Sequence, residues 1–233
     1  MNINELELDE FDLDDLPEHA SICLIGKRRS GKGVLTKDIC FHHFRSRVDN
    51  VFLFSPTSEI ANNMMDYVPV AFRYKELDID VIERIMTRQE YLVRVDPKGR
   101  HNVLLIIDDI IASTNADQNK ILRKLFVCAR HFRISLIVSF QYLKGTFDPV
   151  MRENCDVVFL FNSNNFANKQ IITEQYLNTS NNKNDGYGLV GKYAVGHQAL
   201  VISNTNNSND FDEYCFHYTA DLIKRKFKLG KDY

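Results

Sequence analysis

The stretch SICLIGKRRSGKGVLTKDI, residues 21–39, decides the fold. An apolar run, Ser21–Ile25, leads into a glycine-rich turn, and the residues from Lys32 to about Arg47 have the character of a helix. The turn matches the pattern G-x-x-x-x-G-K from Gly26 to Lys32, which is typical of a phosphate-binding loop when it lies between a strand and a helix. Glycines let the backbone wrap around phosphates, while amide N–H groups and the helix N-terminus supply positive potential. The stretch therefore predicts a nucleotide site.

Most of the expected contacts with the nucleotide come from this loop. We expect Lys32 to reach the β- and γ-phosphates. Gly33 stands where a serine or threonine normally ligates Mg²⁺, so either a water replaces that hydroxyl or Mg²⁺ affinity is weaker. Thr36, one turn further on, is expected to lie too far from the metal. The expected nucleotide-binding residues are Gly26, Lys27, Arg28, Arg29, Ser30, Gly31, Lys32, Gly33 and Val34.

Polar residues follow two further apolar runs. Val103–Ile107 is followed by Asp108 and Asp109. A carboxylate at the end of a buried parallel strand lies beside the phosphate loop, so Asp108 is the expected Mg²⁺ ligand and Asp109 the residue that orients or deprotonates the attacking water. A strand end or a helix cap is the plainer alternative for this pair. Gln141 follows Ile134–Phe140 and is expected to contact the γ-phosphate or its water, or else to be a buried capping residue.

The apolar runs show no polar alternation and are separated by helical patterns, which predicts a mostly parallel sheet with helices on both faces. We expect an α/β fold with a small C-terminal β-hairpin and helix addition. Three parts are expected: an acidic leader (1–19), a P-loop ATPase domain (20–203), and a polar loop with a basic C-terminal helix (204–233). Further expected strands are 51–54, 68–72 and 157–161, further expected helices are 80–91, 119–130 and 168–176, and the hairpin joins 186–193 to Gln198–Ser203 through a turn at 195–197.

Charge is distributed unevenly along the 233 residues. The first 20 carry eight acidic residues and no lysine or arginine, whereas the other 213 carry 29 bases against 23 acids. A basic body behind an acidic tail is compatible with binding a polyanion, and a solvated leader with an ordinary surface is the alternative. Five scattered cysteines favour a reducing compartment, and no apolar run approaches the ~20 residues that span a bilayer.

Four segments together carry a family resemblance: GKRRSGK (26–32), VFLFSPT (51–57), VLLIIDD (103–109) and ARHFRISLIVSFQ (129–141). They resemble the genome-packaging ATPases of large DNA viruses, of the poxvirus type, which are related to virophage enzymes and more distantly to the FtsK–HerA DNA pumps. The resemblance covers about residues 20–162. It implies a P-loop NTPase of the additional-strand type and a homo-oligomeric ring, pentamer or hexamer. It also implies ATP-driven movement of double-stranded DNA into a preformed viral capsid.

The same resemblance implies roles at matching positions. Lys32 is the phosphate lysine, Asp108 the magnesium acid, Asp109 the catalytic acid and Gln141 the sensor. Such rings also use an arginine from a neighbouring subunit to stabilise transition-state charge. Arg130 is the preferred candidate and Arg133 the second, while Arg28 and Arg29 are alternatives within the same subunit.

Contacts with DNA are expected from basic residues that face the ring channel and bind the phosphate backbone in any sequence. The candidates are Lys144 and Arg152, on either side of the segment after Gln141, and Lys224, Arg225 and Lys226 near the C-terminus. The alternative is that these residues lie on a solvated helix face.

The other expected partners are capsid or portal-vertex proteins. The protein is expected to act in the host cytoplasm or virus factory and in association with the virion. Competing functions are a FtsK–HerA-like pump or helicase in replication or transfer, a nucleotide-binding scaffold with weak turnover, and a small-molecule or nucleoside kinase.

Overall fold

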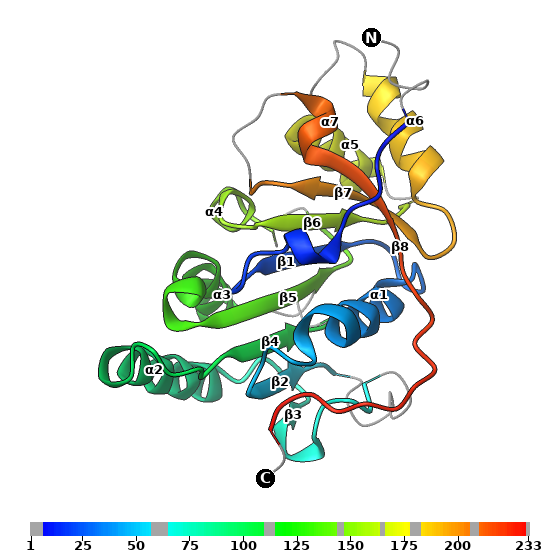
Figure 1. Cartoon of the computed structure of the whole chain (residues 1–233). Coiled ribbons are helices and arrows are strands. Elements are labelled where there is room, and N and C mark those ends of the chain that lie inside the picture. Colours follow the sequence, from blue (N-terminus) through cyan, green and yellow to red (C-terminus); the bar gives the residue numbers. More distant parts are fainter. Residues whose placement is uncertain are drawn as a thin grey trace.

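One mixed sheet organises the chain in the computed structural model, which describes residues 7–56, 65–109, 115–143, 147–163, 166–177, 183–205 and 210–231. Within these residues the strand order is β3-β2-β4-β5-β1-β6-β7-β8 (Figure 1). The first six strands in this order are parallel, and β7 and β8 are antiparallel additions. Because β5 lies between β1 and β4, the predicted P-loop sheet with an additional strand is confirmed. The strands are β1 Ser21–Ile25, β2 Asn50–Phe54, β3 Arg73–Tyr74, β4 Val103–Ile107, β5 Ile134–Phe140, β6 Val157–Leu160, β7 Gln198–Ser203 and β8 Cys215–Thr219.

Helices cover both faces of the sheet, which explains why every residue of β1, β4 and β5 is buried. One cluster of buried side chains joins the sheet to α2 to α6, and a second joins the opposite face to α1 and the π-helical turn η3. None of the described helices is long and apolar enough to cross a membrane. The helices are α1 Lys32–Ile39, η3 Cys40–Phe44, α2 Ile79–Val95, α3 Ala116–Cys128, α4 Pro149–Glu153, α5 Phe166–Tyr176, α6 Lys183–Tyr193 and α7 Phe211–Tyr214.

The predicted hairpin between 186–193 and β7 is wrong, because its first arm belongs to α6. Leu189, Val190, Tyr193 and Ala194 are all buried in one core cluster. Residues three and four apart in this set share one face of a helix, which is why the segment packs as α6. The antiparallel partner of β7 is instead β8.

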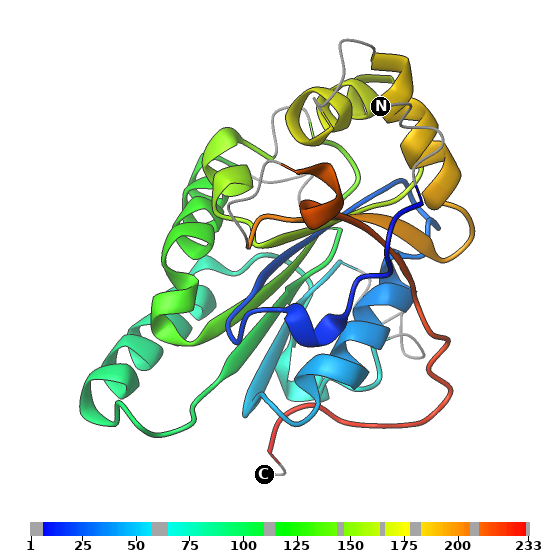
Figure 2. The same ribbon diagram turned by 45° about the horizontal axis from the view of Figure 1, so that its top comes forward.

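The predicted basic C-terminal helix is also wrong. After β8, residues 220–231 run as an extended segment, here called the C-terminal strap, which crosses the face that carries α1 (Figures 1 and 2). Leu229 is buried, and its N–H donates to the carbonyl of Tyr67 at 2.9 Å, while the N–H of Lys231 donates to that of Asp49 at 2.9 Å. The strap therefore finds its backbone partners in distant loops rather than in a helix of its own.

The strand expected at 68–72 begins only at residue 73 and is shorter. Residues Val70–Phe72 form a 3-10 turn, η4, and only Arg73–Tyr74 pair with β2. The proline at position 69 precedes this turn with extended geometry, and a proline cannot donate to a strand ladder. Pairing with β2 therefore begins only after the turn.

The acidic N-terminal segment lies on the sheet from residue 8 onward. Phe11, Leu13 and Leu16 are buried in the same cluster as α1. The N–H of Phe11 donates to the carbonyl of His217 at 2.8 Å, and the N–H of His217 donates to that of Asp9 at 3.0 Å. Both terminal segments therefore contribute to the core of the central domain.

Candidate nucleotide site

The phosphate loop leaves β1 at Ile25 and enters α1 at Lys32. A side chain at Gly26 would come within 2.6 Å of Cβ of Phe161, so this position requires a glycine. Gly31 precedes α1 with φ of 106°, a conformation that glycine adopts readily. These two glycines let the loop turn back over the edge of the sheet where the parallel strands end.

The loop and the ends of β4 and β5 enclose a cavity of about 290 Å³. Its position beyond the carboxyl ends of parallel strands is where α/β folds bind ligands. Of the predicted nucleotide-binding residues, Gly26 and Lys27 do not line the cavity, but their carbonyls hold the side chain of Lys32. The lining residues are Arg28, Arg29, Ser30, Gly31, Lys32, Gly33, Val34, Asp108, Asp109, Gln141 and His197.

Lys32 is held firmly in the loop. Its Nζ donates to the carbonyl of Gly26 at 2.7 Å and to that of Lys27 at 2.9 Å. Burial lowers the pKa of Lys32, and the charges of Asp108 and Asp109 oppose this shift. A γ-phosphate offers the same ammonium a negative partner in place of two neutral carbonyls.

Asp108 fits a magnesium ligand. Burial raises the pKa of its carboxyl, against the hydrogen bond from Ser139, while the Asp109 charge raises it further and Lys32 lowers it. A divalent cation would offset this cost of burying a carboxylate. The hydroxyl of Thr36 donates to the carbonyl of Lys32 at 2.9 Å, which agrees with the expectation that it does not reach the metal.

Asp109 and Gln141 are joined by a hydrogen bond from Nε2 of Gln141 to Oδ1 of Asp109. Asp109 has φ of 56°, a left-handed conformation that turns the chain sharply after β4. The side chain of Asn168 on α5 donates to the carbonyl of Gln141 at 2.7 Å and accepts from the N–H of Leu143 at 3.2 Å. Gln141 thus links the acid pair to α5, a position suited to a sensor.

Two residues of the site were not predicted. Ser139 hydrogen-bonds to Oδ1 of Asp108 and accepts from the N–H of Asp109 at 3.1 Å. Its signal was present in the sequence, as a hydroxyl near the carboxyl end of a buried strand, two residues before Gln141. His197 comes from the turn before β7, and nothing in the local sequence places it beside the loop.

Ser139→Ala is expected to lower the turnover number roughly 10- to 100-fold, the usual cost of losing a group that orients a metal ligand. The change leaves Asp108 and the N–H of Asp109 without their shared partner. Steady-state ATPase kinetics of the purified protein measure the effect. The matched control is Ser135→Ala, a buried serine at the other end of β5, and equal turnover in the two variants would contradict the role of Ser139.

Gly33→Ser is expected to reduce the Mg²⁺ concentration needed for half-maximal ATPase activity, on the order of tenfold, because it restores the hydroxyl of the usual P-loop. Gly33 lies in the first turn of α1 and lines the cavity. Gly33→Ala is the control, since it also replaces the glycine with a better helix former but adds no hydroxyl. A Mg²⁺ titration that gives the same midpoint for both variants would show that the serine hydroxyl does not ligate Mg²⁺.

The arginine candidates Arg130 and Arg133 lie at the opposite edge of the sheet from this cavity. They precede β5, whose seven residues span about 23 Å, whereas Gln141 follows it. The guanidinium of Arg133 donates to the carbonyls of Pro97 and Gly99, and Arg130 is exposed. Of the four arginine candidates, only Arg28 and Arg29 line the cavity of their own subunit. Arg130 could therefore act only on the cavity of a neighbouring subunit.

The expected DNA contacts that the structure describes lie on two separate elements, α4 and the C-terminal strap. Lys144 lies outside the described residues, and Arg152, on α4, donates to the carbonyl of Phe147 at 2.5 Å. Arg152 precedes β6 and so lies at the edge away from the cavity. Lys224, Arg225 and Lys226 are all exposed on the C-terminal strap.

Two viral proteins are similar in sequence to nearly the whole chain. The chain is 26% identical over 242 residues to a protein of Acanthamoeba polyphaga mimivirus, covering 99% of this chain and 82% of that one. It is 25% identical to a protein of Invertebrate iridescent virus 3, covering 91% and 80% of the two chains.

Solved structures share the fold. The genome packaging NTPase of Sulfolobus turreted icosahedral virus 2, in complex with AMPPCP, has a TM-score of 0.54 and 16% identity, covering 81% of this chain and 94% of that one. The type VII secretion ATPase EccC of Thermomonospora curvata has a TM-score of 0.57 and 12% identity, covering 90% of this chain and 26% of that one. A family model described as Poxvirus A32 protein matches residues 8–226, nearly the whole chain. This chain therefore belongs to the poxvirus A32 protein family and has the fold of a P-loop NTPase.

Proposed function

We propose that this chain is an ATPase motor that moves double-stranded viral DNA into a preformed capsid. The observation that carries the proposal is the convergence of Lys32, Asp108, Asp109 and Gln141 around one cavity of an additional-strand P-loop sheet. Membership of the poxvirus A32 family and a fold shared with a viral genome packaging NTPase support it. That NTPase was solved with a nucleotide analogue bound, which supports ATP as the ligand here.

The side chains divide the chemistry among them. Lys32 would exchange its two carbonyl partners for the β- and γ-phosphates, and Asp109 would orient or deprotonate the water that attacks the γ-phosphate. Asp108 would hold Mg²⁺ with waters in the remaining positions, since Gly33 supplies no hydroxyl. The ion, when bound, neutralises charge that develops on the phosphates. Gln141, bonded to Asp109 and to α5, would transmit the state of the nucleotide to the rest of the domain.

Assembly into a ring, pentamer or hexamer, is part of the proposal, because the expected arginine has to come from a neighbour if it is Arg130. Arg28 and Arg29 already line the cavity and are the alternative source of positive charge. We place this ring in the host cytoplasm or virus factory and on the virion, in contact with capsid or portal-vertex proteins. The exposed cations of the strap, Lys224, Arg225 and Lys226, remain candidates for DNA backbone contacts.

The test is Mg²⁺-dependent ATPase activity of the purified protein with and without double-stranded DNA of unrelated sequences. We expect activity that rises with DNA whatever its sequence, because backbone contacts carry no sequence information. Single-stranded DNA of equal length and a strand-displacement assay separate the motor from a helicase. Activity that does not respond to double-stranded DNA, at concentrations where rings form, would contradict the motor.

A nucleotide-binding scaffold with weak turnover is the second candidate, and Gly33 is the observation that favours it. Without the usual hydroxyl ligand, the site is expected to bind Mg²⁺ more weakly. Stoichiometric ATP binding without measurable hydrolysis would select the scaffold. The retention of Asp109 and Gln141 in contact with each other favours hydrolysis.

A further inference from the structure

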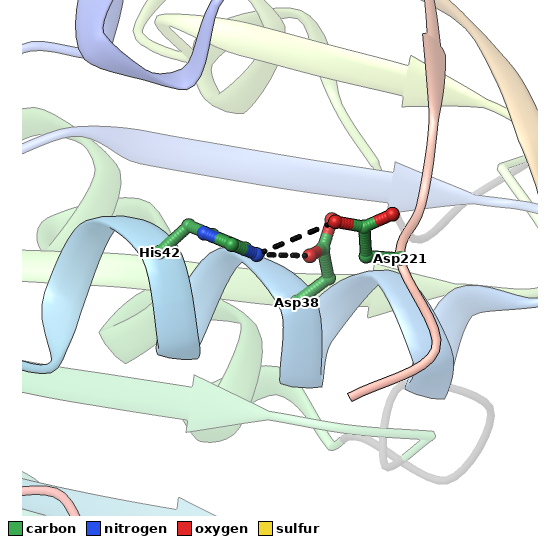
Figure 3. Close-up of side chains that lie close together, drawn as sticks. All are labelled: Asp38, His42 and Asp221. Atoms are coloured by element: carbon green, nitrogen blue, oxygen red, sulfur yellow. Dashed lines mark ion pairs between the residues drawn. The ribbon is translucent and has the colours of Figure 1, made fainter. Parts of the chain in front are cut away.

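A cluster of two aspartates and a histidine lies outside the nucleotide cavity. Asp38 belongs to α1, His42 to the π-helical turn η3, and Asp221 to the C-terminal strap. Figure 3 shows the carboxylates of Asp38 and Asp221 next to each other, with the imidazole of His42 directed toward both. Nε2 of His42 lies 3.5 Å from Oδ1 of Asp38 and 3.5 Å from Oδ2 of Asp221.

Asp38 is the anchor of this cluster. Its side chain is 0% exposed, and its Oδ1 atom accepts no hydrogen bond. Its other oxygen, Oδ2, accepts from the hydroxyl of Tyr218 at 2.6 Å, which fixes the plane of the carboxylate. Burial raises the pKa of Asp38, against the hydrogen bonds from Tyr218 and the Asp221 backbone and the charge of His42. A buried carboxylate oxygen that accepts no hydrogen bond and lies close to a second carboxylate is stabilised when a cation binds between them.

The two separations from His42 match those of ligands on one metal ion. Zinc binds histidine nitrogen and carboxylate oxygen at about 2.0–2.2 Å, so two ligands of a tetrahedral ion lie ~3.3–3.6 Å apart. Both distances from His42 are 3.5 Å, and the three ligand atoms all lie within 4.8 Å of one another. The side chain of Asp221 is 76% exposed and lies on the strap, so it can close the remaining gap.

The surroundings admit and attract a cation. A cavity of about 470 Å³ adjoins the cluster, with space for a water as fourth ligand. Its charged walls are acidic, and such a cleft raises the local concentration of cations. The residues that line it are Glu10, Phe11, Asp12, Leu13, Asp14, His42, Tyr218 and Asp221.

We propose that Asp38, His42 and Asp221 bind one divalent transition-metal ion of the Zn²⁺ class, which fastens the C-terminal strap to α1. An imidazole with two carboxylates suits zinc and its neighbours, whereas Mg²⁺ prefers oxygen ligands alone. The hydrogen bond from Tyr218 to Asp38 is the kind of outer contact that orients a metal-bound carboxylate. The site is independent of the nucleotide chemistry proposed above.

This fastening point lies close to the nucleotide cavity. Asp38 is six residues along α1 from Lys32, a rise of about 9 Å. The N–H of Ala220, next to Asp221, donates to the carbonyl of His197 at 3.3 Å, and His197 lines the nucleotide cavity. The ion would therefore hold the start of the strap in place near that cavity.

The test is a Zn²⁺ titration of the chelator-treated full chain in excess Mg²⁺, followed by calorimetry. We expect one tight site per chain, weakened at least about 100-fold by His42→Ala or Asp221→Asn, since even outer contacts cost 10- to 100-fold. Both side chains are exposed, so these variants should fold. Asp14→Asn is the matched control, because Asp14 lines the same cavity but pairs with Arg47 at 3.1 Å.

A second readout follows the strap itself. Trypsin cleaves after lysine and arginine, so removal of the peptide beyond Lys224 can be timed by mass spectrometry. Zn²⁺ is expected to slow this cleavage in the wild type and in Asp14→Asn, but not in Asp221→Asn. Absorption of the Co²⁺-loaded protein without a thiolate charge-transfer band would exclude a cysteine site. Failure to bind one Zn²⁺ per chain, or equal affinity in the wild type and His42→Ala, would leave the cluster as an ion pair and overturn the proposal.

Discussion

Lys32→Ala is expected to abolish ATP turnover, with a loss of at least about a thousandfold in kcat/KM. The ammonium of Lys32 is the buried cation at the floor of the cavity, and Asp108 and Asp109 face it. Removing it leaves these two carboxylates to repel the γ-phosphate, and it removes the group that stabilises charge on the phosphate in the transition state. Nucleotide affinity should fall as well, because the same contact forms in the ground state.

The control for this change is Lys27→Ala in the same loop. Lys27 is exposed and contributes its carbonyl, not its side chain, to the site. Fluorescent-nucleotide binding and phosphate release, measured side by side, separate the two effects. Turnover retained in Lys32→Ala, or lost equally in Lys27→Ala, would mean that the phosphates bind elsewhere.

The site could be predicted from sequence where a motif coincides with the end of a strand. Lys32, Asp108 and Gln141 each follow a short apolar run, and a parallel sheet brings the carboxyl ends of such runs to one edge. The additional strand was implied by the family resemblance alone, and the structure confirms it, since β5 lies between β1 and β4. Ser139 was missed because a hydroxyl inside an apolar strand is also compatible with simple burial.

The parts that could not be predicted depend on contacts between distant segments. The 186–193 segment contains three glycines and two tyrosines, a composition that favours strand or turn locally, and only packing against β7 and α5 makes it α6. The strap has charged residues around Phe227 and Leu229, a pattern that predicts a solvated helix. In the structure its backbone donates instead to the carbonyls of Tyr67 and Asp49, and Phe227 stacks on Tyr67. Asp221 meets Asp38 and His42 only because β8 pairs with β7 and delivers the strap to α1.

The second large effect is expected for Asp109→Asn, which should abolish hydrolysis, again by about a thousandfold or more, while ATP still binds. Asparagine has the same shape and keeps an oxygen for the hydrogen bond from Gln141. It cannot take a proton from water, and it lacks the charge that polarises the attacking oxygen. Because Lys32 and the loop are untouched, the contacts that hold the phosphates remain.

The contrast with Asp108→Asn separates the two acids. Asp108 contacts Ser139, and burial raises the pKa of its carboxyl, so its amide variant should lose affinity for Mg²⁺-bound ATP, with a smaller effect on metal-free nucleotide. Asp109→Asn should instead trap ATP at near wild-type affinity. A nucleotide that dissociates from Asp109→Asn as fast as from Lys32→Ala, or a variant that still hydrolyses it, would assign the catalytic role to another group.

In a ring, such a trapped subunit would also suppress its neighbours, so mixing Asp109→Asn into the wild type should reduce activity more than in proportion to its share. A purely proportional loss would indicate subunits that hydrolyse ATP independently.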